Sequence, residues 1–181
     1  ALTELLPGRF QHVDVGCGTG VLLAMLRAVG WSSVGVDLSP AMIQAARKRR
    51  GRLPVGVADV RALPFFGSAG LLTFLFDSIN FLLEEEAVRR ALLEMARSLA
   101  SGGVLYFDMV TERMVTEHFA GQRWEEDNGG FVSNWSSQYD RKSACTETKV
   151  RINSGNESVL RERIYPQRLF ESALRDAGLT L

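Results

Sequence analysis

The sequence contains few of the residues that build metal sites or disulfide frameworks. Its 181 residues include two cysteines and two histidines. Cys17 and Cys145 are far apart, and there is no CxxC pair and no cluster of cysteine with histidine. This spacing argues against a disulfide framework and against a zinc site. We therefore expect a protein without a structural metal.

An excess of charge of either sign is also absent, since 21 Lys and Arg residues balance 21 Asp and Glu residues. This balance argues against binding of nucleic acid or anionic membrane through bulk charge, although it leaves a local basic groove open. No apolar run approaches the roughly 20 residues of a membrane helix, and the N-terminus lacks the pattern of a signal peptide. We expect a cytoplasmic protein, and a homodimer is left open.

Short apolar runs alternate with helical patterns from Phe10 to about Val110. The runs are continuous and rich in β-branched residues, as in strands that helices cover on both faces. Five runs are predicted to be strands: HVDV, SVGVD, LPVGVA, LLTFLFD and GVLYFD. The alternation predicts an α/β fold of the Rossmann-like, doubly wound type, with a mainly parallel sheet and helices on both faces.

Three segments between these strands predict helices. SPAMIQAARKRRG begins with Ser39 as a candidate cap and Pro40 in the first turn, and its cations precede a terminating Gly51. EEEAVRRALLEMARSLASGG opens with acidic residues and repeats apolar residues on one face. VLLAMLRAVG, at residues 21–30, is apolar almost all round, so we expect it to be buried between the sheet and another element.

The stretch HVDVGCGTG, at residues 12–20, joins the first predicted strand to a helix through closely spaced glycines. Such a loop presents bare backbone N–H groups to a nucleotide-like ligand at the carboxyl edge of the sheet. A pyrophosphate site of the dinucleotide type requires G-x-G-x-x-G. Here Gly16, Gly18 and Gly20 form G-x-G-x-G, and Val21 occupies the position of the third glycine of that fingerprint.

Acidic residues lie near the ends of the predicted strands. Asp14, just before the glycine loop, would repel a pyrophosphate by about 1 kcal/mol or more, but would favour an ammonium or sulfonium ligand. S-adenosylmethionine carries both cations. Asp37 ends the second strand, where a carboxylate can accept hydrogen bonds from ribose hydroxyls. Asp59, followed by Val60, comes after the third strand and could bind an adenine amino group. Asp77 ends the fourth predicted strand, facing the transferable methyl.

With these residues the chain resembles the class I S-adenosylmethionine-dependent methyltransferases. The matching motifs are DVGCGTG, GVDLSPAMIQAARKR, ADVRALPF, the strand ending in Asp77 and GGVLYFDMV, in the order and spacing of that family. The resemblance implies S-adenosylmethionine as the cofactor. It also implies contacts to the methionine moiety from Asp14 and the glycine loop, to the ribose from Asp37, and to the adenine from Met42, Asp59 and Val60. The full set of cofactor-binding residues is then Asp14, Gly16, Cys17, Gly18, Gly20, Asp37, Leu38, Met42, Asp59, Val60 and Asp77.

The sequence changes character after Asp108. FVSNWSSQYD, ACTETKVRIN and SVLRERIY alternate apolar and polar residues, which predicts antiparallel strands with one buried face, and YPQRLFESALRDAG predicts a helix. This part resembles the antiparallel lid that small-molecule methyltransferases insert after the fifth strand. We expect a core domain at residues 1–110, a lid at 111–165, and a final segment at 166–181. That segment would hold the helix and, in GLTL, the start of a further strand in the truncated end of the core sheet.

Several candidate residues also have simpler structural interpretations. Asp37 could cap a helix, and Asp59 could form a turn. For Asp77, a capping role or a link to Asn80 competes about evenly with a place in the active site. Cys17 is interpreted as a small residue whose backbone matters, because no nearby residue would act as its base.

The aromatic and histidine residues are also interpreted structurally first. Phe131, Trp135 and Tyr139 are expected to form the core of the lid, with a role for Trp135 or Tyr139 in the substrate pocket as the alternative. His12, at the start of a strand, and His118, in a polar helix, are expected to be structural or exposed to solvent.

The leading functional hypothesis is direct in-line methyl transfer to a nitrogen, oxygen or carbon of a small molecule. Because a sulfonium is already a good leaving group, alignment and exclusion of water can supply most of the acceleration. A hydroxyl acceptor would need a base, for which Asp77 is the first candidate and His118 the second.

The DSIN sequence at Asp77 lacks the Pro-Pro-aromatic turn of DNA amino-methyltransferases, which favours a small substrate, while protein and ribosomal RNA substrates stay open. The alternatives are a non-catalytic module that binds the cofactor, and a nicotinamide-dependent oxidoreductase, which Val21 disfavours.

Overall fold

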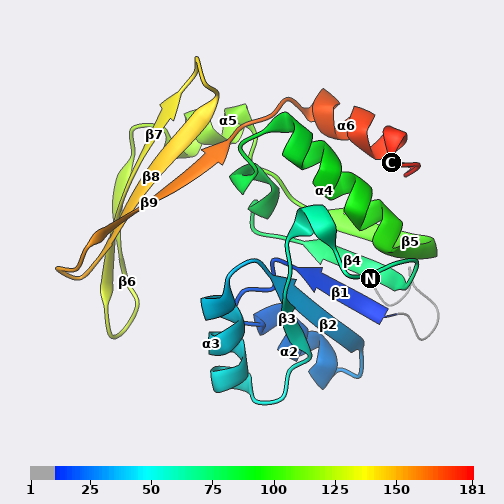
Figure 1. The fold of residues 1–181 in the computed structure, drawn as a ribbon. Helices are drawn as coiled ribbons and strands as arrows, with labels where there is room; N and C mark the ends of the chain where they lie inside the picture. Colours follow the sequence, from blue (N-terminus) through cyan, green and yellow to red (C-terminus); the bar gives the residue numbers. More distant parts are fainter. Residues whose placement is uncertain (1–10) are drawn as a thin grey trace.

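The computed structural model describes residues 11–181 and divides them between two sheets (Figure 1). The first is a five-stranded parallel sheet with the strand order β3-β2-β1-β4-β5. The expectation that the N-terminus lacks a signal peptide concerns residues 1–10, which lie outside the part of the chain that the structure describes. The strands of this sheet are β1 (Gln11–Val15), β2 (Ser32–Asp37), β3 (Val55–Val57), β4 (Ala69–Phe74) and β5 (Leu99–Phe107).

The order of these strands reverses at β1. From β1 the chain continues through β2 to β3 on one side, and then crosses back to place β4 and β5 on the other. Val13 is paired with Val34 of β2 and with Leu72 of β4. Open α/β sheets bind ligands where the strand order reverses in this way. The predicted doubly wound α/β fold is therefore confirmed, and the glycine loop directly follows β1 at this point.

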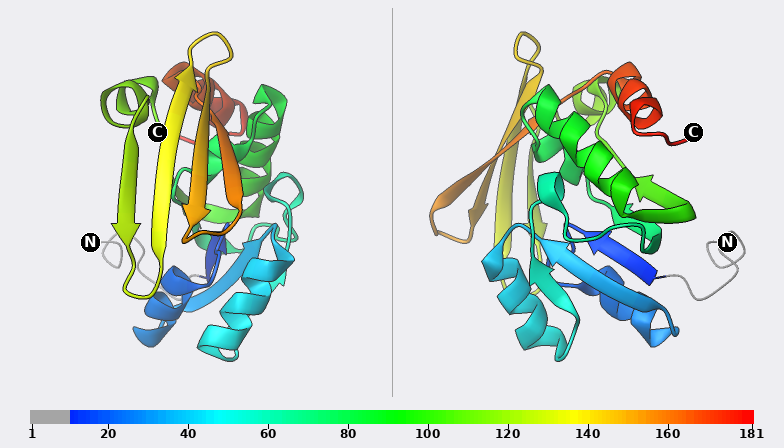
Figure 2. Two further views of the ribbon diagram at one scale, coloured as in Figure 1. Left: turned by 90° about the vertical axis from the view of Figure 1, so that its left-hand side faces the viewer. Right: turned by 45° about the vertical axis from the view of Figure 1, so that its right-hand side comes forward.

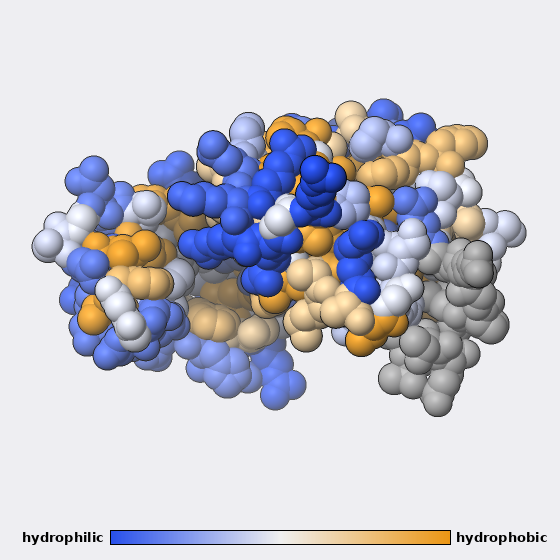
Figure 3. Space-filling view, turned by 90° about the horizontal axis from the view of Figure 1, so that it is seen from below, coloured by the Kyte–Doolittle hydropathy of each residue, from blue (hydrophilic) through white to orange (hydrophobic). Residues whose placement is uncertain are grey.

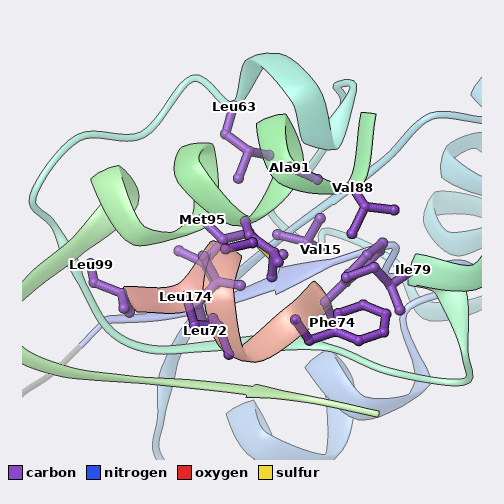
Figure 4. Packing of buried hydrophobic residues seen from close by; sticks show 14 of the residues in the cluster. Val15, Leu63, Leu72, Phe74, Ile79, Val88, Ala91, Met95, Leu99 and Leu174 are labelled. Atoms are coloured by element: carbon purple, nitrogen blue, oxygen red, sulfur yellow. The ribbon is translucent and has the colours of Figure 1, made fainter. Parts of the chain in front are cut away.

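The helices of the core domain are α2 (Val21–Ala28), α3 (Pro40–Arg50), α4 (Glu85–Ser98) and α6 (Gln167–Asp176). The largest buried cluster joins the sheet to α4 and α6. In Figure 4, Leu72 and Phe74 of β4 approach Val88 and Met95 of α4 and Leu174 of α6. Because strand side chains alternate, His12 and Asp14 lie on the opposite face of β1 from the valines in this cluster.

Two predicted helices are confirmed in detail, whereas the prediction for the first is wrong in one respect. The hydroxyl of Ser39 accepts a hydrogen bond from the Met42 N–H at 3.3 Å and so caps α3. Helix α4 buries its predicted apolar face. In α2, however, only Leu23 is buried, and Met25 is 64% exposed. The helix therefore contacts the sheet along a narrow stripe, so apolar composition overstated its burial.

The C-terminal residues correct a second prediction, because GLTL forms no strand. The N–H groups of Gly178 and Leu179 donate to the carbonyl oxygens of Arg175 and Leu174 at 2.9 Å each. These bonds close the end of α6 around Gly178, whose φ is 79°. Leu179 packs against the main cluster instead of pairing with β5.

The lid is a four-stranded antiparallel sheet that forms a single layer beside the core domain (Figure 2). Three strands were predicted, and the structure adds a fourth, β6. Short helical turns lead into the sheet at α5 (Glu112–Met114) and η3 (Val115–Phe119). The strands are β6 (Arg123–Asp127), β7 (Val132–Asp140), β8 (Cys145–Ile152) and β9 (Glu157–Arg163). Trp124, Trp135 and Val150 are paired across three of them, so they lie on one face of the sheet.

None of the helices in residues 11–181 combines the length and the apolar composition that crossing a bilayer requires.

Candidate functional site

The glycine loop adopts backbone conformations that favour glycine. Gly16, Gly18 and Gly20 have φ values of 65°, 52° and 72°. A Cβ atom at Gly20 would lie 2.8 Å from the Cδ1 atom of Leu53, and one at Gly16 would lie 3.3 Å from the ring of Phe74. In the part of the chain that the structure describes, and apart from Gly18 and its two chain neighbours, no heavy atom lies within 4 Å of the position of a Cβ at Gly18. The loop is thus packed at both ends and open in the middle, as a ligand-binding turn requires.

Asp37 connects this loop to the start of α3. Its Oδ2 atom accepts a hydrogen bond from the Gly18 N–H, and its Oδ1 atom accepts one from the Ser39 N–H, at 2.8 Å each. A carboxylate has about four acceptor positions, so two remain for other donors such as ribose hydroxyls. The capping interpretation and the ribose interpretation of Asp37 are therefore compatible in one geometry.

A chain of buried polar groups lies on the face of the sheet that carries Asp14. The Thr73 hydroxyl donates to Oδ1 of Asp14 at 2.7 Å, and Nε2 of His12 lies 2.9 Å from the Thr73 oxygen. Because the single hydroxyl proton points to Asp14, His12 donates from Nε2, and its buried Nδ1 has no partner in the described part of the chain. His12 is thus structural, as expected.

Burial shifts the pKa values of Asp14 and His12, the two end members of this hydrogen-bonded series, in opposite directions. Loss of solvation raises the pKa of Asp14 to about 6, with a smaller contribution in the same direction from the charge of Asp37. The same burial lowers the pKa of His12 to about 4, so the imidazole is neutral. Asp14 is consequently a carboxylate that a nearby cation would strongly stabilise.

Cys17 has the properties expected of a structural residue. Its N–H donates to the carbonyl oxygen of Val36 at 3.0 Å, which ties the loop to β2. Burial, together with the charges of Asp14 and Asp37, raises the pKa of its thiol to about 12. A thiol with that pKa carries almost no thiolate at neutral pH, which argues against a nucleophile.

The predicted adenine-binding residues lie beside Asp37 and just after β3. Leu38 and Met42 are 65% and 46% exposed, and these apolar surfaces are available to a flat aromatic ligand. Val60 starts the 3₁₀ turn η1 (Val60–Ala62). Asp59 accepts hydrogen bonds from the Arg61 side chain on both carboxylate oxygens, at 3.0 and 2.5 Å. Arg61 also lowers the pKa of Asp59, so an adenine amino group would share this carboxylate with Arg61.

A buried glutamate fixes the loop that contains η1. Glu94 of α4 accepts a hydrogen bond from the Leu63 N–H at 3.2 Å, and its carboxylate is paired with Arg97 at 2.6 Å and Arg90 at 3.0 Å. These contacts hold the segment from Asp59 to Leu63 against α4.

The structure contradicts the prediction that Asp77 ends a strand. β4 ends at Phe74, and Asp77 precedes the 3₁₀ turn η2 (Ser78–Phe81) without making a capping hydrogen bond from its side chain. The reason is conformational, because Phe76 and Asp77 have φ values of 59° and 48°, which a strand does not allow. Non-glycine residues in this region carry strain that is common at functional sites.

The carboxyl group of Asp77 meets Glu162, which comes from β9 of the lid. The two carboxyl groups are close enough to influence each other's pKa, and Oε2 of Glu162 accepts a hydrogen bond from the Thr146 hydroxyl at 3.2 Å. Burial, followed by the charge of Asp77, raises the pKa of Glu162 to about 7. Burial and then the charge of Asp108 raise the pKa of Asp77 as well.

A cavity of about 190 Å³, which we call the lid cavity, lies between the turn that contains Asp77 and the lid, and both carboxyl groups line it. Trp124 and Trp135 line it, with their rings stacked 5.6 Å apart and 4° from parallel. The lining also includes Phe81, Val110, Val115, Phe119, Ser137, Thr146, Thr148 and Leu160. Figure 3 shows apolar side chains in the recess between the lid and the core domain. The alternative interpretation of Trp135 as a pocket wall thus matches its position.

Hydrogen bonds from the side chain of Asn80 connect the core domain to both ends of the lid. Its Nδ2 group donates to the carbonyl oxygens of Arg163 at 2.8 Å and Val110 at 3.3 Å, and its Oδ1 atom accepts from the Val110 N–H at 2.9 Å. Val110 precedes the lid, and Arg163 ends its last strand. Asn80 is fully buried, so these bonds form in a water-poor environment.

Sequence reasoning missed three residues of this region, namely Thr73, Trp124 and Glu162. Thr73 is a single polar residue in an apolar run, which was a usable signal for a buried hydrogen bond. Glu162 lies two residues after Leu160 in SVLRERIY, so the period of two in a strand would have placed both side chains on the inner face of the lid. Trp124 lies in RWEED, where one apolar residue among charges gave little indication of a strand. His118, the second candidate base, is 65% exposed and is absent from the cavity lining.

No group of three or more His, Cys, Asp or Glu side chains in the described chain is arranged to hold a metal ion.

Comparison with known proteins supports the interpretation of the fold. Residues 13–107 match the family described as "Methyltransferase domain". The dTDP-4-amino-2,3,4,6-tetradeoxy-D-glucose N,N-dimethyltransferase of Saccharopolyspora spinosa is 33% identical over 99 residues, covering 55% of this chain and 40% of that protein. The malonyl-acyl-carrier-protein O-methyltransferase of Serratia marcescens is 29% identical over 123 residues, covering 68% of this chain and 46% of that protein.

A solved structure extends the likeness to the lid. The X-ray structure of the sugar N-methyltransferase KedS8 from Streptoalloteichus sp. superposes with a TM-score of 0.79 at 28% identity, covering 98% of this chain and 74% of that one. The chain spans less than half the length of the two curated relatives. Because the family match covers more than half of the chain, this protein belongs to the methyltransferase domain family.

Proposed function

We propose that this protein transfers a methyl group from S-adenosylmethionine to a small molecule. The observation that carries the proposal is the arrangement at the end of β1, where the open glycine loop, buried Asp14 and Asp37 lie close together. A diphosphate would meet two carboxylates there, whereas a cationic nucleoside would be favoured. Membership of the methyltransferase domain family supports the same assignment.

The residues present fit this cofactor. Asp14 would face the ammonium of the methionine moiety, and the remaining acceptor positions of Asp37 would bind the ribose hydroxyls. Leu38 and Met42 would cover the adenine, with Asp59 and Val60 at its edge. The space above Gly18 allows close approach to the backbone. Asp77, at the next turn of the sheet edge, would lie on the side of the transferable methyl.

When bound, S-adenosylmethionine supplies an electrophilic methyl group on a sulfonium that leaves as a neutral thioether. The chain has to orient an acceptor in line with that methyl and to exclude water. The lid cavity is suited to this task, because stacked indoles and apolar side chains surround two carboxyl groups. We infer that the acceptor binds there. The size of this cavity, about 190 Å³, favours a small acceptor over a protein or ribosomal RNA.

The names of the relatives support small acceptors but differ in the atom that is methylated. One name describes an N,N-dimethyltransferase of an amino sugar, and another an O-methyltransferase of malonyl-acyl-carrier protein. A cavity filled by side chains would have favoured a non-catalytic binding module, whereas this cavity is open. A nicotinamide-dependent oxidoreductase has no support from the family match, and Val21 stands against it.

The direct test is turnover with a library of small amines, alcohols and carboxylic acids. Labelled methyl from S-adenosylmethionine should appear on at least one library member, together with a stoichiometric amount of S-adenosylhomocysteine. Binding of S-adenosylhomocysteine without transfer to any library member would favour the non-catalytic module instead.

The pKa of Asp14 predicts how cofactor binding depends on pH. If an ionised Asp14 binds the ammonium, affinity for S-adenosylhomocysteine should weaken about ten-fold when pH falls from 7 to 5, through the pKa of about 6. Calorimetric titration at several pH values measures this. The stability of the protein without ligand should change in the opposite direction and increase as pH falls. A raised carboxyl pKa contributes stability that is lost as pH rises through it. The Asp14→Asn variant should show a nearly flat profile, and an unchanged slope would refute the assignment.

We further propose the division into a core at residues 1–110, a lid at 111–165 and a final segment at 166–181. The positions of the two sheets and of α6 support these boundaries. A cytoplasmic location is supported by the two free cysteines. The balanced charge argues against nucleic acid as a partner, and a homodimer stays a prediction for sedimentation analysis.

A further inference from the structure

We propose that the acceptor is an amine, that the Asp77 and Glu162 carboxyl pair binds it in the lid cavity, and that Glu162 receives the proton it must lose. This inference rests on the proposed methyltransferase function and adds the chemical class of the acceptor and a catalytic residue from the lid.

The charges around the cavity select for a cation. Asp77 and Glu162 line the cavity, and Asp108 lies behind Asp77, accepting a hydrogen bond from its N–H at 3.3 Å. Among residues 11–181, no lysine, arginine or histidine belongs to the lining of this cavity. A hydroxyl or carboxylate acceptor would therefore bring its oxygen lone pairs into a field of like sign, while an ammonium would neutralise it.

The cations nearest in sequence to Glu162 are engaged elsewhere. Nη1 of Arg163 donates to the carbonyl oxygen of Leu83 at 2.9 Å, and its guanidinium lies over the ring of Tyr165. Arg161 is paired with Glu147 at 3.2 Å on the opposite face of the lid. On the facing strands, the nearby polar groups are the hydroxyls of Thr146, Thr148 and Ser137. Neutralisation of the carboxyl pair is thus left to a ligand.

Two stacked tryptophans, Trp124 and Trp135, line the same cavity. The indole N–H groups of Trp124 and Trp135 donate to Glu126 at 3.1 Å and Ser133 at 3.0 Å. Neither indole therefore needs a hydrogen-bond acceptor from the ligand. Aromatic faces attract cations, particularly where water is excluded. The lid thus adds a second group of contacts for an ammonium and its alkyl substituents.

Burial and the charge of Asp77 raise the pKa of Glu162 to about 7, so its carboxylate can accept a proton near neutral pH. An arriving alkylammonium would be bound by the ionised pair and would pass one proton to Glu162. The resulting amine nitrogen forms a bond to the methyl carbon, the carbon–sulfur bond breaks, and its electron pair stays on sulfur. The products are the methylammonium and neutral S-adenosylhomocysteine, and Glu162 returns its proton to water.

A pair of probes of equal shape tests the recognition step. Protein loaded with S-adenosylhomocysteine is titrated with cyclohexylamine and with cyclohexanol, using tryptophan fluorescence because Trp124 and Trp135 line the cavity. We expect cyclohexylamine to bind at least ten-fold more tightly at pH 8. This preference should decline below pH 7 as Glu162 becomes protonated, although the alkylammonium itself stays charged over this range.

Three variants test whether the preference for the amine depends on the carboxyl groups of Asp77 and Glu162. Glu162→Gln and Asp77→Asn should each reduce the amine preference several-fold, and Glu162→Gln should also remove its pH dependence. Asparagine tolerates the positive φ of Asp77, so that backbone is retained. Glu157→Gln, on the same strand but paired with Lys149 and Arg151, is the matched control and should behave as wild type. Titration with S-adenosylhomocysteine verifies the fold of each variant.

With S-adenosylmethionine present, wild-type protein should form N-methylcyclohexylamine, detected by mass spectrometry, and Glu162→Gln should lower kcat at least ten-fold. Equal affinities for the two probes, no saturable signal from either, or unchanged preference and kcat in Glu162→Gln would overturn the inference. Failure of wild-type protein to bind S-adenosylhomocysteine would be seen before any probe is added, and it would overturn the proposed function as well.

Discussion

The Asp37→Ala variant should bind S-adenosylhomocysteine about thirty-fold more weakly than the wild type. Asp37 accepts hydrogen bonds from the N–H groups of Gly18 and Ser39 at 2.8 Å each, which leaves about two acceptor positions for the proposed ribose hydroxyls. Removing a charged acceptor of this kind costs about 2 kcal/mol, which corresponds to the stated change in affinity. Alanine also frees the Gly18 N–H, so the loop and the ligand contact are lost together.

Two further variants separate these contributions in isothermal titration. Asp37→Asn retains one oxygen acceptor and should lie between the wild type and alanine. Asp59→Ala should weaken binding less than Asp37→Ala, because Arg61 already occupies both oxygens of Asp59. Wild-type affinity in Asp37→Ala would remove Asp37 from the cofactor site.

The Asn80→Ala variant should lower the free energy of unfolding by about 3 kcal/mol. The side chain is fully buried and makes three hydrogen bonds to the backbone of Val110 and Arg163. Truncation leaves the Val110 N–H and two carbonyl oxygens without these partners, at about 1–3 kcal/mol for each group that stays dry. Urea denaturation measures the loss.

Asn80→Ala should also impair transfer more than cofactor binding. Val110 and Arg163 are the two points where the chain enters and leaves the lid, so their release should loosen the lid cavity while the glycine loop is retained. Asn128→Ala is the control, because Asn128 is an exposed lid residue that donates to Glu126 and Ser133. Equal destabilisation by both substitutions would contradict the proposed role of Asn80.

The residues of the cofactor crevice were predictable because their signals are local. Gly16, Gly18 and Gly20 follow directly on β1, and Asp37 stands between the end of β2 and a capped helix. In a parallel sheet, strand ends meet at one edge, so sequence position alone brings these groups together. The positions of these residues in the structure agree with that reasoning.

The acceptor side of the site was not predictable in the same way. Asp77 and Glu162 are 85 positions apart in the sequence, and their contact depends on how the lid docks on the core domain. The positive φ values of Phe76 and Asp77 have no signature in the apolar run that precedes them. β6 was missed because RWEED does not alternate, and its pairing with β7 and the stack of Trp124 on Trp135 account for it instead. Long-range packing determines these features.

The crystal structure of this protein with S-adenosylhomocysteine tests the central claim most directly. We predict the ribose hydroxyls within hydrogen-bonding distance of Asp37, the amino acid moiety over the glycine loop with its ammonium toward Asp14, and the sulfur facing Asp77. A ligand bound away from the end of β1, or a crevice that admits NADH and excludes S-adenosylhomocysteine, would contradict the account.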